Sequence, residues 1–220
     1  RGADGQPLPG HEDTRMIEVE GVKLGFLGLT TATTAQVSSP GDVTFADELE
    51  TAQAQAAALR EAGADIVVAV AHTGRDVDFA MYDGRVADVV LTGHDHDLRV
   101  VYNGRTAMVE SSSQADFVVV THLDVTVEVE GDERDVSWRP RFEVVDTATV
   151  EPNAEIAGLV AGYEAELSEA LDVEIGTSAI ALDSRRASVR SMETVIGNVI
   201  TDAMRAATGA DVALTNGGGI

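Results

Sequence analysis

Two uninterrupted apolar runs, ADIVVAVAHTG and DVVLTG, constrain the fold of this chain more than any other feature. They occupy residues 64–74 and 88–93, and neither shows the apolar-polar alternation of a half-buried strand. Strands of parallel sheets are buried on both faces and therefore show continuous runs of this kind. The sequence thus predicts two neighbouring strands in the middle of a parallel sheet.

The segments around these runs predict a layered α/β core. RMIEVE and VKLGFLGLTT read as strands joined by a turn at Gly21. Residues 47–62 have helical periodicity, and Asp47 and Glu50 have the spacing of a capping box. A short helix over 77–82, capped by Asp76, precedes the second apolar run. The order strand, helix, strand, helix, strand is typical of a layered α/β fold.

After Leu98 the pattern changes to alternating strands, for which we predict antiparallel pairing. RVVYNGRTAMVE contains a hairpin turn at Asn103-Gly104, and the run over 116–146 turns at Gly131-Asp132. The β pattern stops near residue 150, which divides the chain into expected domains 1–150 and 151–220. In the second domain we expect a helix over 153–171, a strand over 174–182, a helix over 192–207 and a strand over 211–215.

Composition narrows the classes of partner. The chain has 38 acidic and 15 basic residues and a formal net charge of −23, so it would repel nucleic acid polymers and anionic lipid. No apolar stretch approaches the roughly 20 residues of a membrane helix. Lys23 is the only lysine, which fits either adaptation to high salt or a genome that favours arginine codons. Cysteine is absent, so a metal site here must use His, Asp, Glu or Asn.

Histidines follow both apolar runs. His72 and His94 lie at the carboxyl ends of the two predicted strands, where open α/β sheets place their ligand sites, and His96 follows two residues later. Neutral imidazole is a ligand for Zn²⁺, Mn²⁺ and related ions. A lone histidine after a strand is also an ordinary hydrogen-bonded loop residue, but the three together favour a metal site. Asp95 and Asp97 could orient these imidazoles through hydrogen bonds, but we interpret them as solvated turn carboxylates.

At this point the sequence resembles the 5'-nucleotidase family of calcineurin-like metallophosphoesterases. VKLGFLGLTT, ADIVVAVAHTG and ADVVLTGHDHDL resemble consecutive strands of its metallophosphatase domain, the last with a G-H-x-H signature. VRSMETVIGNVITDAMR and ADVALTNGGGI resemble the start of its nucleotide-recognising domain. The resemblance implies part of a four-layer α/β/β/α sandwich over 1–150, followed by a connector helix and the beginning of a second α/β domain over 151–220.

The resemblance also implies site residues and an activity. His72 and His94 would bind one divalent ion and His96 a second, Arg190 would contact the substrate phosphate, and Asn216 matches the asparagine of an N-G-G-x-I-R loop. The ions would be Zn²⁺, Mn²⁺ or similar, and the reaction would be hydrolysis of nucleotide phosphate esters. A 2',3'-cyclic nucleotide phosphodiesterase, a nucleotide-sugar hydrolase and a non-catalytic metal- or nucleotide-binding module are the alternatives.

Several family motifs do not occur in this sequence. In the family, the D-x-H, G-D and G-N-H-D/E motifs follow one another in that order and supply the remaining metal ligands, the bridging aspartate and a catalytic histidine. This series of motifs does not occur here. We therefore expect no catalytic residue in this chain, no turnover by residues 1–220 alone, and a longer natural protein. The resemblance further implies work outside the cytoplasm, in a secreted, periplasmic or cell-surface protein, and says nothing of oligomeric state.

Overall fold

The chain folds into two compact units, Arg1–Glu151 and Pro152–Ile220. The computed structural model describes residues 1–131, 133–174 and 176–220. The predicted turn at Gly131-Asp132 lies partly outside the described residues.

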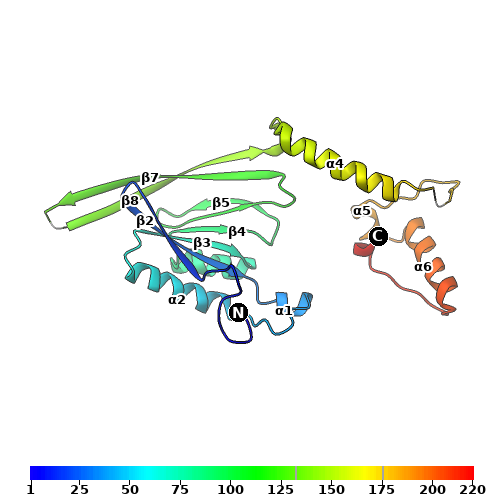
Figure 1. The fold of residues 1–220 in the computed structure, drawn as a ribbon, viewed down its shortest axis with the longest axis horizontal. Coiled ribbons are helices and arrows are strands. Elements are labelled where there is room, and N and C mark those ends of the chain that lie inside the picture. Colours follow the sequence, from blue (N-terminus) through cyan, green and yellow to red (C-terminus); the bar gives the residue numbers. More distant parts are fainter. Residues whose placement is uncertain (132, 175) are drawn as a thin grey trace. The chain divides into compact units, whose positions relative to one another are not determined.

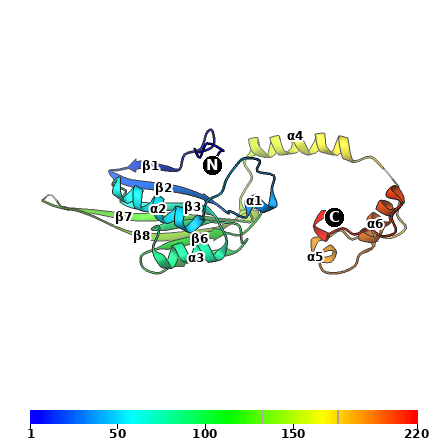
Figure 2. The same ribbon diagram turned by 90° about the horizontal axis from the view of Figure 1, so that it is seen from below.

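A six-stranded mixed sheet forms the centre of the first unit. Its strands are β1 (Thr14–Val19), β2 (Val22–Thr30), β3 (Ile66–His72), β4 (Val89–Thr92), β5 (Leu98–Tyr102) and β6 (Ala107–Ser111). Their spatial order is β1-β2-β3-β4-β6-β5, and Figure 2 shows β1 beside β2 at one edge. The four central strands are parallel, and each edge strand pairs antiparallel with its neighbour. The two apolar runs are therefore adjacent parallel strands, as predicted.

Helices cover one face of this sheet and a long hairpin covers the other (Figure 1). On the first face, α2 (Glu48–Glu61) and α3 (Arg75–Gly84) pack against alternate residues of the central strands. On the second face, β7 (Phe117–Glu130) and β8 (Glu133–Asp146) form a separate two-stranded sheet. On this second face, Trp138 of β8 packs against the alternate strand residues that point away from the helices, among them Ile66 and Val68. The short elements α1 (Thr34–Val37) and η1 (Thr147–Thr149) complete the unit.

Two local predictions are confirmed by hydrogen bonds. The Glu50 amide donates to Asp47 Oδ1 at 2.8 Å and so caps the start of α2. Asn103 Oδ1 accepts from the amides of Arg105 and Thr106, and Gly104 has a φ of 89°, which together make the turn between β5 and β6.

Two other predictions for this unit are wrong. The helix predicted over 77–82 begins at Arg75, with Gly74 as its N-cap and no side-chain cap, so Asp76 does not cap it. The strands after Leu98 are not all antiparallel, because β6 pairs parallel with β4 as well as antiparallel with β5. β6 lies between β4 and β5, and its first four residues are all buried, as expected for a strand inside the sheet.

The second unit contains helices but no strand among its described residues. Its elements are α4 (Ala154–Leu171), α5 (Arg186–Val189), α6 (Val195–Thr208) and η2 (Gly217–Gly219). The strand predicted over 174–182 is absent from the described part of that range, and the strand over 211–215 is also absent. Val212 and Leu214 are 70% and 88% exposed, and no segment within the described residues pairs with this stretch to make it a strand.

Helix starts in the second unit follow their caps. Asn153 Oδ1 accepts from the amides of Glu155 and Ile156, so α4 begins at Ala154, close to the predicted start. Thr194 Oγ1 accepts from the Gly197 amide, and α6 therefore begins at Val195 rather than at 192. Within the described ranges, no helix has both the length and the apolar character needed to cross a membrane.

Candidate metal-binding site

Two of the predicted histidines meet at the carboxyl edge of the sheet. His72 is the last residue of β3 and pairs with Thr30 of β2, while His94 lies two residues beyond the end of β4. His94 Nδ1 lies 3.3 Å from His72 Nε2, and the two rings meet edge to face with centroids 5.0 Å apart. Both side chains are exposed, so the nitrogens are accessible from solvent.

The distance between these two nitrogens fits a shared metal ion. Two nitrogen ligands that each lie about 2.0–2.1 Å from one tetrahedral ion are roughly 3.3–3.4 Å apart. Without an ion, the N–H of one ring can donate to the unprotonated nitrogen of the other at the same distance. Neutral imidazoles therefore satisfy either arrangement, and the donor set suits Zn²⁺ and Mn²⁺.

The structure does not bring His96 into the same cluster. In the described ranges, no three His, Cys, Asp or Glu side chains are grouped closely enough to hold one ion. The backbone of this loop is unusual, because His94 has a φ of 101° and His96 a φ of 65°. Residues other than glycine rarely adopt such values, and they concentrate at functional sites. His96 is exposed, and its role as a ligand stays a prediction.

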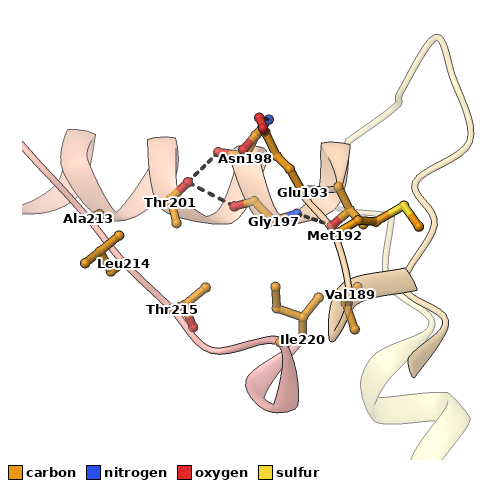
Figure 3. A pocket seen from close by; sticks show the side chains of 12 residues that line it. Val189, Met192, Glu193, Gly197, Asn198, Thr201, Ala213, Leu214, Thr215 and Ile220 are labelled. Carbon is orange, nitrogen blue, oxygen red and sulfur yellow. Dashed lines mark hydrogen bonds between the residues drawn. The ribbon is translucent and has the colours of Figure 1, made fainter. Parts of the chain in front are cut away.

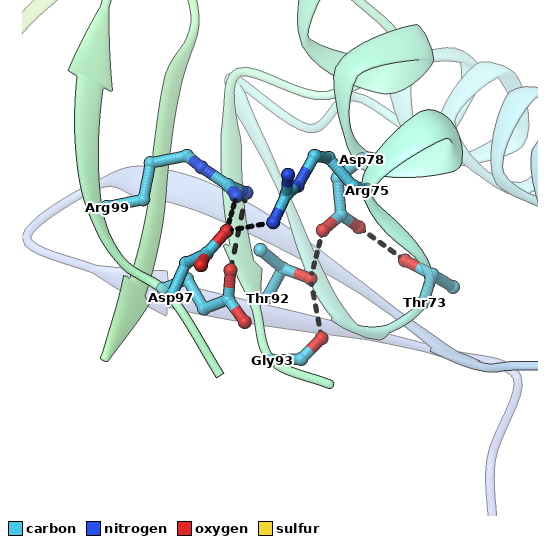
Figure 4. A network of polar contacts seen from close by, with 8 residues as sticks. Thr73, Arg75, Asp78, Thr92, Gly93, Asp97 and Arg99 are labelled. Atoms are coloured by element: carbon cyan, nitrogen blue, oxygen red, sulfur yellow. Dashed lines mark hydrogen bonds and ion pairs between the residues drawn. The ribbon is translucent and has the colours of Figure 1, made fainter. Parts of the chain in front are cut away.

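Arginines hold the loop that carries these histidines. Asp97 Oδ2 accepts from Arg75 at the start of α3 and from Arg99 of β5 (Figure 4). Arg99 Nη1 also lies 3.3 Å from Glu110 Oε2, and the Glu110 side chain is completely buried. The interpretation of Asp97 as a solvated carboxylate holds only in part, because its side chain is 38% exposed and its charge is paired with two guanidinium groups.

Asp95 is not a fully solvated turn carboxylate either. It is partly buried, and its Oδ2 has no hydrogen-bond partner within the described part of the chain. The residues on both sides of it, His94 and His96, have positive φ.

A buried aspartate beneath the site escaped the sequence analysis. Asp78 in the first turn of α3 is 0% exposed and accepts from Thr73 Oγ1 at 2.5 Å and Thr92 Oγ1 at 2.9 Å (Figure 4). Burial raises the pKa of the Asp78 carboxyl, the two hydroxyls oppose that rise, and nearby Asp95 and Glu110 add to it. One sequence signal could have revealed it, since Asp78 lies three residues before the buried Met81 and therefore on the core-facing side of its helix.

In the second unit, the two predicted substrate-binding residues lie side by side. A Cβ atom added at Gly218 would lie 3.1 Å from Asn216 Nδ2 and 3.3 Å from Arg190 Nη2. Both nitrogens are donors and both side chains are exposed, an arrangement that suits an anion. A Cβ at Gly217 would lie 2.0 Å from the Val189 carbonyl oxygen, so only glycine lets this loop approach the end of α5 so closely.

A pocket of about 240 Å³ lies beside this loop, between α6 and the 213–220 segment (Figure 3). Its polar lining includes Asn198, whose Nδ2 donates to Glu193 Oε1 at 2.8 Å, and Thr201, whose hydroxyl donates to the Gly197 carbonyl at 3.0 Å. Asn198 therefore faces a cavity within its own unit.

Comparisons with known proteins agree with this reading of the fold. A family model for the 5'-nucleotidase C-terminal domain matches residues 174–220. The trifunctional nucleotide phosphoesterase protein YfkN of Bacillus subtilis is 33% identical over an alignment that covers 93% of this chain and 15% of that protein. The cell wall protein Lmo0130 of Listeria monocytogenes is 28% identical, with 92% of this chain and 30% of that protein covered.

A solved structure supports the same assignment. The crystal structure of the 5'-nucleotidase precursor from Thermus thermophilus is 28% identical, with a TM-score of 0.67 over 94% of this chain and 45% of that chain. The fold is thus that of a metallophosphoesterase. More narrowly, the chain belongs to the 5'-nucleotidase family of calcineurin-like metallophosphoesterases. It spans less than half the length of each of these three proteins.

Proposed function

We propose that residues 1–220 form part of a metal-dependent hydrolase of nucleotide phosphate esters, of the 5'-nucleotidase type. The observation that carries the proposal is the His72–His94 pair, whose facing nitrogens lie 3.3 Å apart at the carboxyl edge of a parallel sheet. Membership of the 5'-nucleotidase family supports the same reaction class.

Each site residue has a proposed part in this reaction. His72 and His94 would hold one divalent ion and His96 a second. When bound, such ions activate a water molecule and neutralise charge on the phosphate. Arg190 and Asn216 would donate hydrogen bonds to phosphate oxygens, because their donor groups lie beside the same glycine. We assign no general acid, general base or nucleophile to a residue of this chain.

The substrate and the compartment belong to the same proposal. A 5'-mononucleotide is the proposed substrate, and cyclic nucleotides and nucleotide sugars are the alternatives that a substrate panel would separate. The net charge of −23 argues against a nucleic acid polymer as partner. Work outside the cytoplasm is proposed because a relative that aligns with most of this chain is named a cell wall protein.

Calorimetric titration with Zn²⁺ and with Mn²⁺ tests the metal part of the proposal. We expect His72→Ala and His94→Ala each to weaken binding at least about tenfold, since each removes one of two adjacent ligands. His11→Ala is the matched control, because His11 is exposed in the N-terminal loop and its ring forms a hydrogen bond with the Pro9 carbonyl. Equal metal affinity in the wild-type protein and the three variants would contradict the proposal.

Hydrolysis and binding of AMP test the nucleotide part. We expect residues 1–220 to bind AMP and to hydrolyse it no faster than buffer containing the same metal ion. Arg190→Ala and Asn216→Ala should weaken binding, whereas Arg186→Ala at the start of α5, the helix that Arg190 follows, should not. Turnover that is lost in His94→Ala would show a complete site, whereas AMP binding that is insensitive to Arg190 would remove the nucleotide assignment. Metal binding without any nucleotide binding would favour the non-catalytic module.

A further inference from the structure

The two histidines extend from strands whose shared ladder stops before it reaches them. The last backbone pair between β3 and β4 is Val70 with Leu91. His72 lies two residues beyond that pair on one strand, and His94 lies three residues beyond it on the other. Backbone pairing between β3 and β4 therefore does not fix the separation of the two imidazoles.

Asp78 spans this gap from the helix that follows β3. One carboxyl oxygen accepts from Thr73, the residue after His72, and the other accepts from Thr92, the last residue of β4. Thr92 in turn leads through Gly93 to His94. A single buried carboxyl group thus joins the two chain segments that carry the facing nitrogens (Figure 4).

The burial of Asp78 is unfavourable for the stability of the fold. Asp78 is 0% exposed, and the described residues form no ion pair with it. Burial of a carboxylate without a cation destabilises the folded state by several kcal/mol. An apolar side chain of similar size would avoid that penalty. What a carboxylate provides, and an apolar residue does not, is two acceptors in fixed directions.

We propose that Asp78 is a positioning residue for the His72–His94 pair, which holds the ends of β3 and β4 at the separation that one metal ion requires. The inference rests on the proposed metal-binding function. Residues that orient metal ligands through hydrogen bonds typically change metal affinity about 10- to 100-fold when they are replaced.

Two variants remove the bridge in different ways. Asp78→Leu keeps the approximate size of the side chain but removes both acceptors, and Thr92→Val removes the β4 arm without altering the helix. Asp83→Leu is the matched control, because Asp83 is an exposed carboxylate near the other end of the same helix. Circular dichroism establishes that each variant is folded.

A metal-free measurement reads the geometry directly. The wild-type protein should show a nuclear Overhauser effect between the ring protons of His72 and His94, whose ring centroids lie 5.0 Å apart. We expect this signal to be lost or weakened several-fold in Asp78→Leu and Thr92→Val, and to be unchanged in Asp83→Leu. If both folded variants keep the full signal, the inference is overturned.

A metal titration completes the test. Zn²⁺ affinity should fall about tenfold or more in Asp78→Leu and Thr92→Val, with an altered visible absorption spectrum of the Co²⁺ form. A lower melting temperature with unchanged Zn²⁺ affinity and an unchanged Co²⁺ spectrum would show a purely structural role and overturn the inference. If wild type and His94→Ala bind Zn²⁺ equally, the proposed function fails instead, and the Overhauser comparison still decides whether Asp78 sets the separation of the rings.

Discussion

Removal of Arg99 should destabilise the first unit far more than removal of its partner Glu110. The Glu110 side chain is completely buried, and in the described part of the chain neither of its carboxyl oxygens has a hydrogen-bond partner. Arg99, with Nη1 3.3 Å from Glu110 Oε2, supplies the positive charge that offsets it. Arg99→Met would leave that carboxylate buried and unpaired, and such a loss costs about 3–5 kcal/mol.

Glu110→Met should cost much less. Arg99 would keep its ion pair with Asp97 and its position over the Phe79 ring, 5.3 Å from the centroid, so no charge would be left without a partner. Replacement of a buried ion pair by apolar residues of similar size is often neutral. The double variant Arg99→Met/Glu110→Met should therefore have a free energy of unfolding about 1–3 kcal/mol higher than that of Arg99→Met alone.

Urea unfolding followed by tryptophan fluorescence measures these differences. Trp138 is the only tryptophan and lies against the sheet of the first unit, so its signal reports that unit. The reasoning would be refuted if Arg99→Met lowered the free energy of unfolding by less than about 1 kcal/mol. A double variant as unstable as Arg99→Met would refute it equally.

Three further predictions concern stability. Gly25→Ala should cost about 1–3 kcal/mol in urea unfolding, since its Cβ would lie 3.0 Å from Ala64 Cβ and Leu59 Cδ2, whereas Gly28→Ala on the same strand meets nothing within 4 Å and should be nearly neutral; equal costs would contradict the packing. Arg134 lowers the pKa of Asp65 mainly through its side-chain hydrogen bond, so this carboxylate stabilises the fold above its ordinary pKa and that stability is lost as the pH falls through the lowered value. Asp65→Asn should therefore lower the melting temperature at neutral pH and matter progressively less in acid, and a pH-independent difference would count against the ion pair. Amides of the second unit should exchange with solvent faster than those of β3, because its apolar helix faces are exposed, and equal protection would mean that the two units unfold together.

The sequence was sufficient for the elements whose local signals agree with their packing. The continuous apolar runs predicted β3 and β4, because burial on both faces leaves no polar alternation to confuse the pattern. The Asp47 cap and the Asn103-Gly104 turn could be predicted because each involves no more than four consecutive residues. The meeting of His72 and His94 followed from the topology, because parallel strands end at one edge.

The failures come from interactions between residues distant in sequence. Helical periodicity places Asp78 on the core-facing side of its helix, but its hydrogen bond with Thr92 depends on where β4 lies, which the local sequence does not specify. The pattern over 211–215 has the composition of a strand, yet a strand exists only where another segment pairs with it. Sequence reasoning likewise could not foresee that β6 would lie between β4 and β5.

Anomalous diffraction from crystals of this chain soaked with Zn²⁺ tests the central claim most directly. The account predicts a strong zinc peak about 2.0–2.1 Å from both His72 Nε2 and His94 Nδ1, with these nitrogens as two of its ligands. The peak should be absent from crystals of His94→Ala. A zinc ion bound elsewhere on the acidic surface, with the two imidazoles still joined only by their own hydrogen bond, would contradict the claim that this pair is a metal site.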